Sequence, residues 1–122
     1  HKEYRRQRQM CIRDRQMDNG EFQSAIQLFT KVININPEFA EAWNKRATTY
    51  FLMGEFDKSI SDIEKTLILE PRHFGALDGL AEIYLLKKDL IKAAATYEKI
   101  LKIIPSSKKS KDRLEKINEL FV

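Results

Sequence analysis

The sequence predicts an all-α protein built from repeated pairs of antiparallel helices. Its 122 residues include only four glycines and three prolines, which leaves few of the tight turns that a β-rich fold requires. Pro37, Pro71 and Pro105 follow one another at intervals of 34 residues. Between these prolines, apolar residues recur at the three- and four-residue spacing of amphipathic helices. One unit of two helices therefore repeats along the chain.

The residues around the three prolines agree in register. The segments that end at the prolines read KVININP, KTLILEP and KILKIIP. Upstream, a small residue and a large residue recur at matching positions, as Ala25 and Phe29 do in the first unit. After two of the prolines, matching residues are again 34 positions apart, namely Trp43 with Leu77, Ala47 with Ala81, and Tyr50 with Tyr84.

This pattern resembles the tetratricopeptide repeat, whose period is 34 residues. It is carried by AWNKRATTY…F…S…I…P at 42–71 and by ALDGLAEIY…L…A…Y…P at 76–105, and it covers almost all of 16–107. The resemblance implies a right-handed α-solenoid of antiparallel helix pairs, and the phrasing looks like bacterial, proteobacterial-type repeat proteins. The signature positions are Pro37, Trp43, Ala47, Tyr50, Gly54, Pro71, Leu77, Ala81, Tyr84 and Pro105.

The expected helices follow from their apolar faces and from the residues that end them. Phe22, Ile26 and Phe29, for example, lie on one face of the first helix. Each proline ends a unit because it cannot continue a helix and disfavours helical backbone in the residue before it. Small residues at matched positions let paired helices approach closely. We expect helices over residues 22–35, 39–53, 56–69, 73–86, 90–103 and 108–121.

Glycines mark the expected turns between the helices of a unit. Gly20 and Gly54 would supply the left-handed backbone that is inexpensive only for glycine. Lys88 and Asp89 stand where the third unit would have that glycine. The sequence leaves the shape of that last turn open.

The last helix has the composition of a terminal cap. Leu114, Ile117, Leu120 and Phe121 fall on one side of it, and its other faces are charged or polar. A capping element needs one face on the last repeat and the rest in water. The predicted organisation is a first segment over 1–15, a truncated first repeat over 16–39, a second repeat over 40–73, a third over 74–107 and the C-terminal capping helix over 108–122.

The first fifteen residues, HKEYRRQRQMCIRDR, are expected not to be native protein. Arg5 to Arg15 resembles the in-frame translation of a common transposase sequencing adapter, and such scars are excluded from fold reasoning. The whole chain has 22 basic and 18 acidic residues, and the remainder after residue 15 has 16 of each. The basic excess that would suggest nucleic acid therefore belongs to the excluded segment. We expect no nucleic-acid partner.

Catalytic and metal-binding residues are scarce. Beyond residue 15 the chain has one histidine, His73, no cysteine, and no metalloprotease, nucleophile-elbow or phosphate-loop motif. A general base needs a partner and a pocket, and the sequence suggests neither for His73. We expect a non-enzyme with no cofactor and no metal.

Arg46 stands where the commonest form of this repeat has an apolar residue. Asp62 falls on the facing helix of the same repeat. The third repeat has Leu80 and Thr96 at these two positions, so both charges are absent there together. We therefore expect Arg46 and Asp62 to contact each other.

The resemblance places the partner-binding surface on the concave face, along the first helix of each repeat. Related domains that bind chaperone tails hold a terminal carboxylate with lysines and asparagines. Asn44 matches in type, but Asp78 and Glu82 would repel an anion, so a mixed groove suits an amphipathic or extended peptide better. The alternative is that these are merely solvated helix faces. The candidate residues are Glu41, Asn44, Lys45, Thr48, Phe51, Asp78, Glu82 and Leu85, with Gly75 among them on the same face.

The predicted function is a scaffold or adaptor that binds a protein or peptide on its concave face. The alternative is a regulatory or docking domain of a larger enzyme whose catalytic part precedes residue 16. No stretch approaches eighteen consecutive apolar residues, so no membrane span is expected. The sequence leaves the compartment open between cytoplasm and periplasm, and it names no partner.

Overall fold

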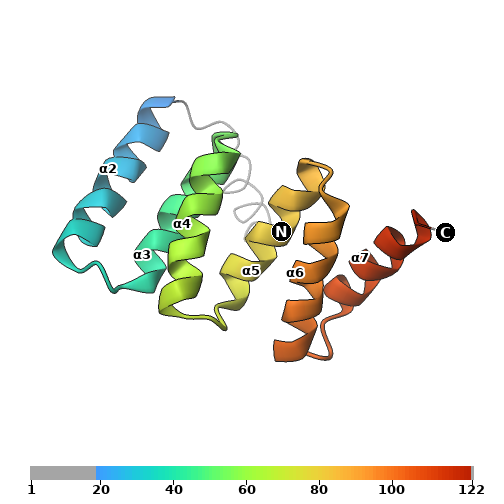
Figure 1. Cartoon of the computed structure of the whole chain (residues 1–122). Helices are drawn as coiled ribbons and strands as arrows, with labels where there is room; N and C mark the ends of the chain where they lie inside the picture. Colours follow the sequence, from blue (N-terminus) through green and yellow to red (C-terminus); the bar gives the residue numbers. More distant parts are fainter. Residues whose placement is uncertain (1–18, 122) are drawn as a thin grey trace, which may run out of the picture.

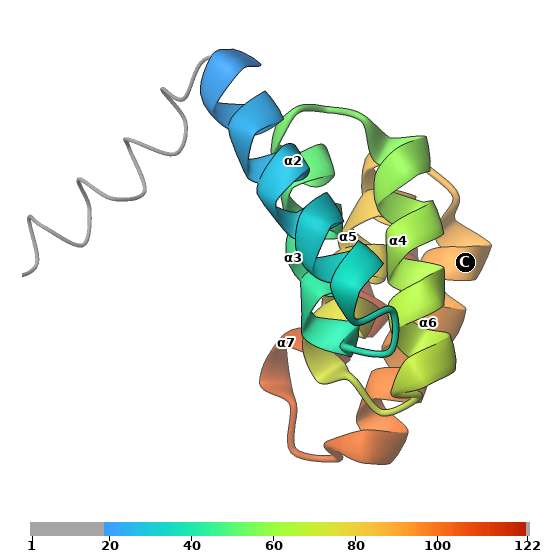
Figure 2. The same ribbon diagram turned by 90° about the vertical axis from the view of Figure 1, so that its left-hand side faces the viewer.

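A computed structural model describes residues 19–121 of the chain, which form six α-helices in this range. Consecutive helices run antiparallel and stand side by side in a row (Figure 1). The view turned by 90° shows α4 and α6 on one side of the row and α3 and α7 on the other (Figure 2). The helices are α2 (Asn19–Ile35), α3 (Ala40–Leu52), α4 (Phe56–Leu69), α5 (Phe74–Leu86), α6 (Leu90–Ile103) and α7 (Lys108–Glu119).

The connections after the prolines are built alike. Each proline stands two residues beyond a helix end, and the next helix begins three residues later. The same backbone hydrogen bond closes each connection: the N–H groups of Phe39, His73 and Ser107 donate to the residue three positions earlier, at 3.0–3.1 Å. The period of 34 residues is therefore a period of the backbone as well. Helices α3 and α5 begin one residue later than predicted because Phe39 and His73 occupy the N-cap positions.

The turn inside each repeat also recurs, although its sequence changes. Gly54 has φ 82° and Lys88, 34 positions on, has φ 63°. In both turns the amide of this residue donates three positions back, and the next amide donates to Tyr50 or Tyr84 at 2.9 Å. This is the Schellman arrangement that satisfies the last carbonyls of a helix. The shape that the sequence left open at Lys88 is thus that of Gly54.

The turn expected at Gly20 is wrong. Gly20 lies inside α2, which begins at Asn19, three residues before the predicted start. Glycine permits a left-handed turn but does not require one, and Gly54 takes it because two helices meet there. At Gly20 the chain continues as a helix.

The core lies between the two layers of helices. One buried cluster around Leu77, Ala81 and Tyr97 joins α5, α6 and α7, and a second around Ala47 and Ile63 joins α3, α4 and α5. Ala47 and Ala81 are almost completely buried, as close packing of paired helices requires. The hydroxyl of Ser59 donates to the carbonyl of Ala47 at 2.7 Å, so the small residues of facing helices touch directly.

Helix α7 continues the 34-residue register, and its role as a terminal cap stays a prediction. Ser110 and Ile117 are buried like their equivalents in α5, Ala76 and Ile83. The positions that face the second helix of a repeat, Leu77, Ala81 and Tyr84 in α5, become exposed polar residues in α7. These residues are Lys111, Glu115 and Asn118.

Half of the apolar face predicted for α7 is wrong. Leu120 is 68% exposed and Phe121 is 62% exposed, because the helix ends at Glu119 and neither residue belongs to its last turn. Leu114 and Ile117 alone carry the contact of this face with α6. The prediction that residues 1–15 are not native protein lies outside the described residues, as does the start of the truncated first repeat.

Candidate functional site

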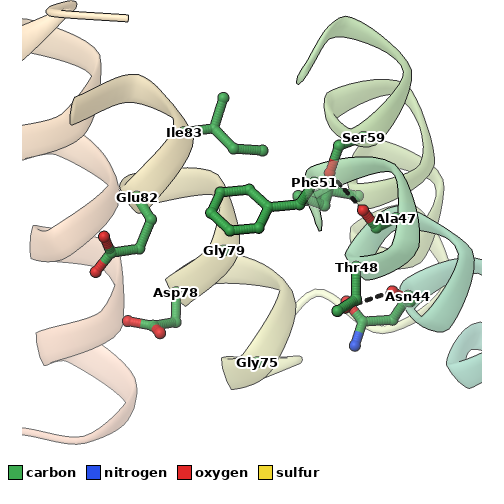
Figure 3. A pocket seen from close by; sticks show the side chains of 11 residues that line it. Asn44, Ala47, Thr48, Phe51, Ser59, Gly75, Asp78, Gly79, Glu82 and Ile83 are labelled. Atoms are coloured by element: carbon green, nitrogen blue, oxygen red, sulfur yellow. Dashed lines mark hydrogen bonds between the residues drawn. The ribbon is translucent and has the colours of Figure 1, made fainter. Parts of the chain in front are cut away.

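A groove separates α3 from α5 on the side of the molecule where α3, α5 and α7 lie. It encloses a hollow of about 200 Å³. Figure 3 shows the ring of Phe51 reaching from α3 across this hollow toward Gly79 and Ile83 of α5. The lining residues are Asn44, Ala47, Thr48, Phe51, Ser59, Ile63, Gly75, Asp78, Gly79, Glu82 and Ile83.

Two glycines one helical turn apart form the α5 side of the groove. A glycine inside a helix costs about 1 kcal/mol relative to alanine, so such a pair calls for a reason. Packing does not supply one at Gly79, where an added Cβ would meet only Ile63 Cδ1, at an ordinary 3.7 Å. At Gly75 the nearest atom is His73 Cε1 at 3.3 Å. The missing side chains leave the helix backbone accessible from the groove.

The structure brings five of the eight candidate residues together in this lining: Asn44, Thr48, Phe51, Asp78 and Glu82. The other three lie elsewhere. Lys45 is exposed on α3 outside the lining, and Leu85 is half-buried against the α5–α6 cluster. Glu41 stands beyond the groove and contacts His73. A binding role for any of the eight stays a prediction.

His73 has a structural task at the start of α5. Its Nδ1 accepts the N–H of Ala76 at 3.0 Å and so caps the helix. Because Nδ1 accepts, the ring proton is on Nε2, which donates to Glu41 Oε1 at 3.0 Å. The histidine thus links the first turns of α3 and α5.

Four charged side chains form the rim between α5 and α7. Lys109 Nζ lies 3.0 Å from Asp78 Oδ2 and 3.0 Å from Glu82 Oε2, and Arg113 Nη2 lies 3.2 Å from Glu82 Oε2. Burial raises the pKa of Glu82, but its hydrogen bonds and attractions to Lys109 and Arg113 prevail and hold it below the ordinary value. Burial lowers the pKa of Lys109 and of Arg113. The groups that face them, foremost the carboxylates, outweigh this effect, so the pKa of each cation is raised above its ordinary value.

Tyr97 lies beneath this rim and connects it to the core. Its side chain is completely buried between α6 and its neighbours. Burial, followed by the negative charge of Glu82, raises the pKa of the Tyr97 hydroxyl, and Arg113 offsets part of that rise. The rim therefore rests on the packed interior rather than on loops.

The contact predicted between Arg46 and Asp62 is confirmed. Arg46 Nε and Nη2 each donate to one carboxylate oxygen of Asp62 at 2.8 Å, and Nη1 donates to Thr30 Oγ1 at 3.0 Å. The hydrogen bonds to Asp62 outweigh burial and raise the pKa of Arg46. The guanidinium also lies 5.2 Å from the Trp43 ring centre. Arg46 thus fastens α3, which carries one wall of the groove, to α2 and α4.

Sequence reasoning missed two parts of the site. Gly79 and Ile83 follow Gly75 by four and eight residues, so they share its face of α5, but no motif in the sequence marks them as site residues. The sequence predicts only water-exposed polar faces for the last helix apart from its apolar side, and Lys109 and Arg113 belong to those faces. Their signal was the register, since they stand 34 positions after Gly75 and Gly79.

Residues 19–121 contain no group of three or more His, Cys, Asp or Glu placed to hold a metal ion. Within the same range, no helix is long and apolar enough to cross a bilayer.

Comparisons with known proteins identify the family of this helical architecture. Two models described as tetratricopeptide repeat match residues 28–61 and 75–107, which together are more than half of the chain. A search of curated proteins gives no match.

Solved structures match over most of the chain. The first repeat domain of Spaghetti (RPAP3) bound to the HSP90 peptide SRMEEVD is 24% identical, covers 84% of this chain and 83% of its own, and has a TM-score of 0.74. The Sgt2 domain from Aspergillus fumigatus is 25% identical, covers 84% of this chain and 69% of its own, and has a TM-score of 0.71. The second domain of human RPAP3 in complex with the HSP70 peptide SGPTIEEVD is 21% identical, covers 81% of this chain and 82% of its own, and has a TM-score of 0.72. With its two matched repeats, its antiparallel helix pairs and these structural relatives, the chain belongs to the tetratricopeptide-repeat family.

Proposed function

We propose that the chain is a non-catalytic interaction domain that binds a peptide segment of another protein in the groove between α3 and α5. The observation that carries this proposal is the glycine pair of α5. Gly79 costs helix stability, fills no packing need, and opens the helix backbone to the groove. Close approach of a ligand to the backbone is a reason to keep such a glycine.

The structural relatives support a peptide as the ligand. The domains of RPAP3 are described with bound HSP90 and HSP70 peptides. The groove here has the mixture that peptide sites use, with the apolar Phe51, Ile63 and Ile83 beside the polar Asn44 and Thr48. An adaptor and the docking domain of a larger enzyme would both use it in the same way.

The test separates binding from stability at Gly79. A library of random twelve-residue peptides is selected on the wild-type chain, and the enriched peptides are then measured against Gly79→Ala and Gly79→Leu. We expect Gly79→Ala to keep or raise the free energy of unfolding, by up to about 1 kcal/mol. Peptide affinity should fall in Gly79→Ala and further in Gly79→Leu, because the side chains fill the groove.

Lys45→Ala is the matched control. Lys45 occupies the position of Gly79 one repeat earlier and lies outside the lining, so this variant should bind as wild type does. A library that enriches no peptide, or peptides that bind Gly79→Leu as well as they bind wild type, would rule out the groove as the binding site.

A further inference from the structure

The rim beside the groove is a closed set of charges. Two carboxylates from α5, Asp78 and Glu82, face two cations from α7, Lys109 and Arg113. Lys109 contacts both carboxylates, and Arg113 contacts Glu82. Every charge in the set is therefore compensated inside the molecule.

The carboxylates belong to the groove but are directed out of it. Asp78 and Glu82 both line the hollow. Figure 3 shows their carboxyl groups pointing away from the ring of Phe51, and the contacts above place them against α7. The apolar centre of the groove thus has no free charge at its α5 edge.

Without these carboxylates, α7 would present a site for anions. Lys109 and Arg113 are four residues apart, so their side chains are neighbours on one helix face. A lysine and an arginine placed together hold a carboxylate by charge-assisted hydrogen bonds. In this chain Asp78 and Glu82 take the place of such a ligand.

We propose that Asp78 and Glu82 act as built-in counter-ions that keep Lys109 and Arg113 occupied, so that the groove accepts an uncharged peptide segment with one large apolar side chain and rejects an acidic one. The inference rests on the proposed function of the groove. It makes the two carboxylates specificity-determining residues, although neither needs to touch the accepted peptide.

The hollow fits an apolar anchor. A dry cavity of about 150 Å³ lined by aliphatic and aromatic residues holds a benzene molecule. The groove has about 200 Å³ beside Phe51, Ile63 and Ile83, which is room for one leucine or phenylalanine side chain. An acidic segment in the same place would have to displace the internal carboxylates or lie against them, and like charges brought together oppose binding.

Two heptapeptides of equal size test the inference. The acidic one is Ser-Gly-Leu-Glu-Glu-Leu-Asp with a free carboxyl terminus. The uncharged one is acetylated Ser-Gly-Leu-Gln-Gln-Leu-Asn amide. Each is titrated into the full chain and into Asp78→Asn/Glu82→Gln, with the backbone amide signals of Gly75, Gly79, Lys109 and Arg113 followed by NMR. The double variant changes two half-buried carboxylates into amides of the same size, and circular dichroism checks its fold.

Wild type should bind the uncharged peptide, with shifts at Gly75 and Gly79, and should bind the acidic peptide at least about tenfold more weakly. The double variant should bind the acidic peptide about tenfold more tightly than wild type does, with new shifts at Lys109 and Arg113. Asp57→Asn is the control, because it removes an exposed ion pair with Lys87 outside the groove, and it should change neither affinity.

The outcomes separate this inference from the function on which it rests. Acidic-peptide affinity that is already high in wild type, or that stays unchanged in the double variant, overturns the counter-ion role and leaves groove binding intact. Peptides that shift none of the Gly75 and Gly79 signals in either protein overturn both.

Discussion

Arg46 and Asp62 join two facing helices by an ion pair, whereas the next repeat has uncharged residues at the same two positions. The Arg46 side chain is 18% exposed and the Asp62 side chain is 5% exposed. The equivalent pair in the next repeat, Leu80 and Thr96, is buried as well. A buried ion pair contributes little net stability over apolar residues of similar volume, but the loss of one partner leaves an uncompensated charge. Leu80 and Thr96 therefore show which residues can replace Arg46 and Asp62 in a test.

We expect Arg46→Leu and Asp62→Thr each to lower the free energy of unfolding, by about 2–4 kcal/mol. Arg46→Leu should cost more because it strands the more deeply buried partner. The double variant should recover at least about 1 kcal/mol relative to the sum of the single effects. Urea denaturation of the four proteins gives the coupling energy, and purely additive costs would mean that the pair contributes nothing as a pair.

Lys88 carries the backbone strain of the second turn. A residue with a Cβ at positive φ costs about 1–2 kcal/mol relative to glycine. Lys88→Gly should therefore raise the free energy of unfolding by about 1 kcal/mol. Lys87→Gly is the control, because Lys87 has φ −84° and gains nothing from glycine. A loss of stability in Lys88→Gly would show that the lysine side chain contributes more than its backbone costs.

At the scale of helices, three equivalent N-termini differ in their caps. His73 and Ser107 accept an amide hydrogen of the first turn, whereas Phe39, at the same position before α3, makes no side-chain cap. Phe39 as a whole is 47% exposed. Phe39→Asp should stabilise the chain by about 1 kcal/mol through a new cap.

Thermal unfolding measures this change, and Phe39→Ala separates it from the loss of the ring. An alanine variant that is as stable as the aspartate variant would mean that the cap does not form. The reverse change, Ser107→Ala, should lower stability by about 1 kcal/mol because it removes an existing cap of α7.

The helices could be predicted within a few residues because their ends are marked by chemistry that acts locally. Pro37, Pro71 and Pro105 each prevent the preceding helix from continuing. The errors fall where no such marker exists. Gly20 can be helical or not, and Leu120 follows Glu119 without any residue that signals the end of α7.

The site was harder to predict than the helices, for a physical reason. Asn44, Thr48, Phe51, Asp78 and Glu82 share a groove because of the repeat period alone, and the period was visible in the sequence. The pairing of Lys109 with Asp78 and Glu82 depends on how α7 rotates against α5, which its buried Ser110 and Ile117 determine. The 34-residue register indicates which face of α7 carries Lys109, but the ion pairs also require α7 to approach α5 closely, and no local pattern shows that distance.

At the scale of the whole molecule, the rim makes stability depend on pH. The pKa of Glu82 is lower in the folded chain than its ordinary value of 4.5. Its contribution to stability is therefore complete above pH 4.5 and is lost as pH falls further through the folded pKa. Protonation of Glu82 removes the charge that faces Arg113 and one of the two charges that face Lys109, and so weakens the hold of α5 on α7.

Denaturation at pH 3–7 checks this dependence. Wild type should lose stability below about pH 4.5, and Glu82→Gln should be less stable at neutral pH with a shallower acid limb. Identical acid limbs in the two proteins would assign the loss to other carboxylates. Asp57, whose hydrogen bond to Lys87 also lowers its pKa, is the first of these.

The glycine side of the groove has a consequence for engineering. A surface made of helix backbone has no rotamers, so its shape stays the same whatever the opposite wall presents. Substitutions at Asn44, Thr48 and Phe51 would then alter ligand preference against a constant reference surface. Libraries restricted to Asn44 and Thr48 would vary the ligand preference while leaving the core contacts of Phe51 in place.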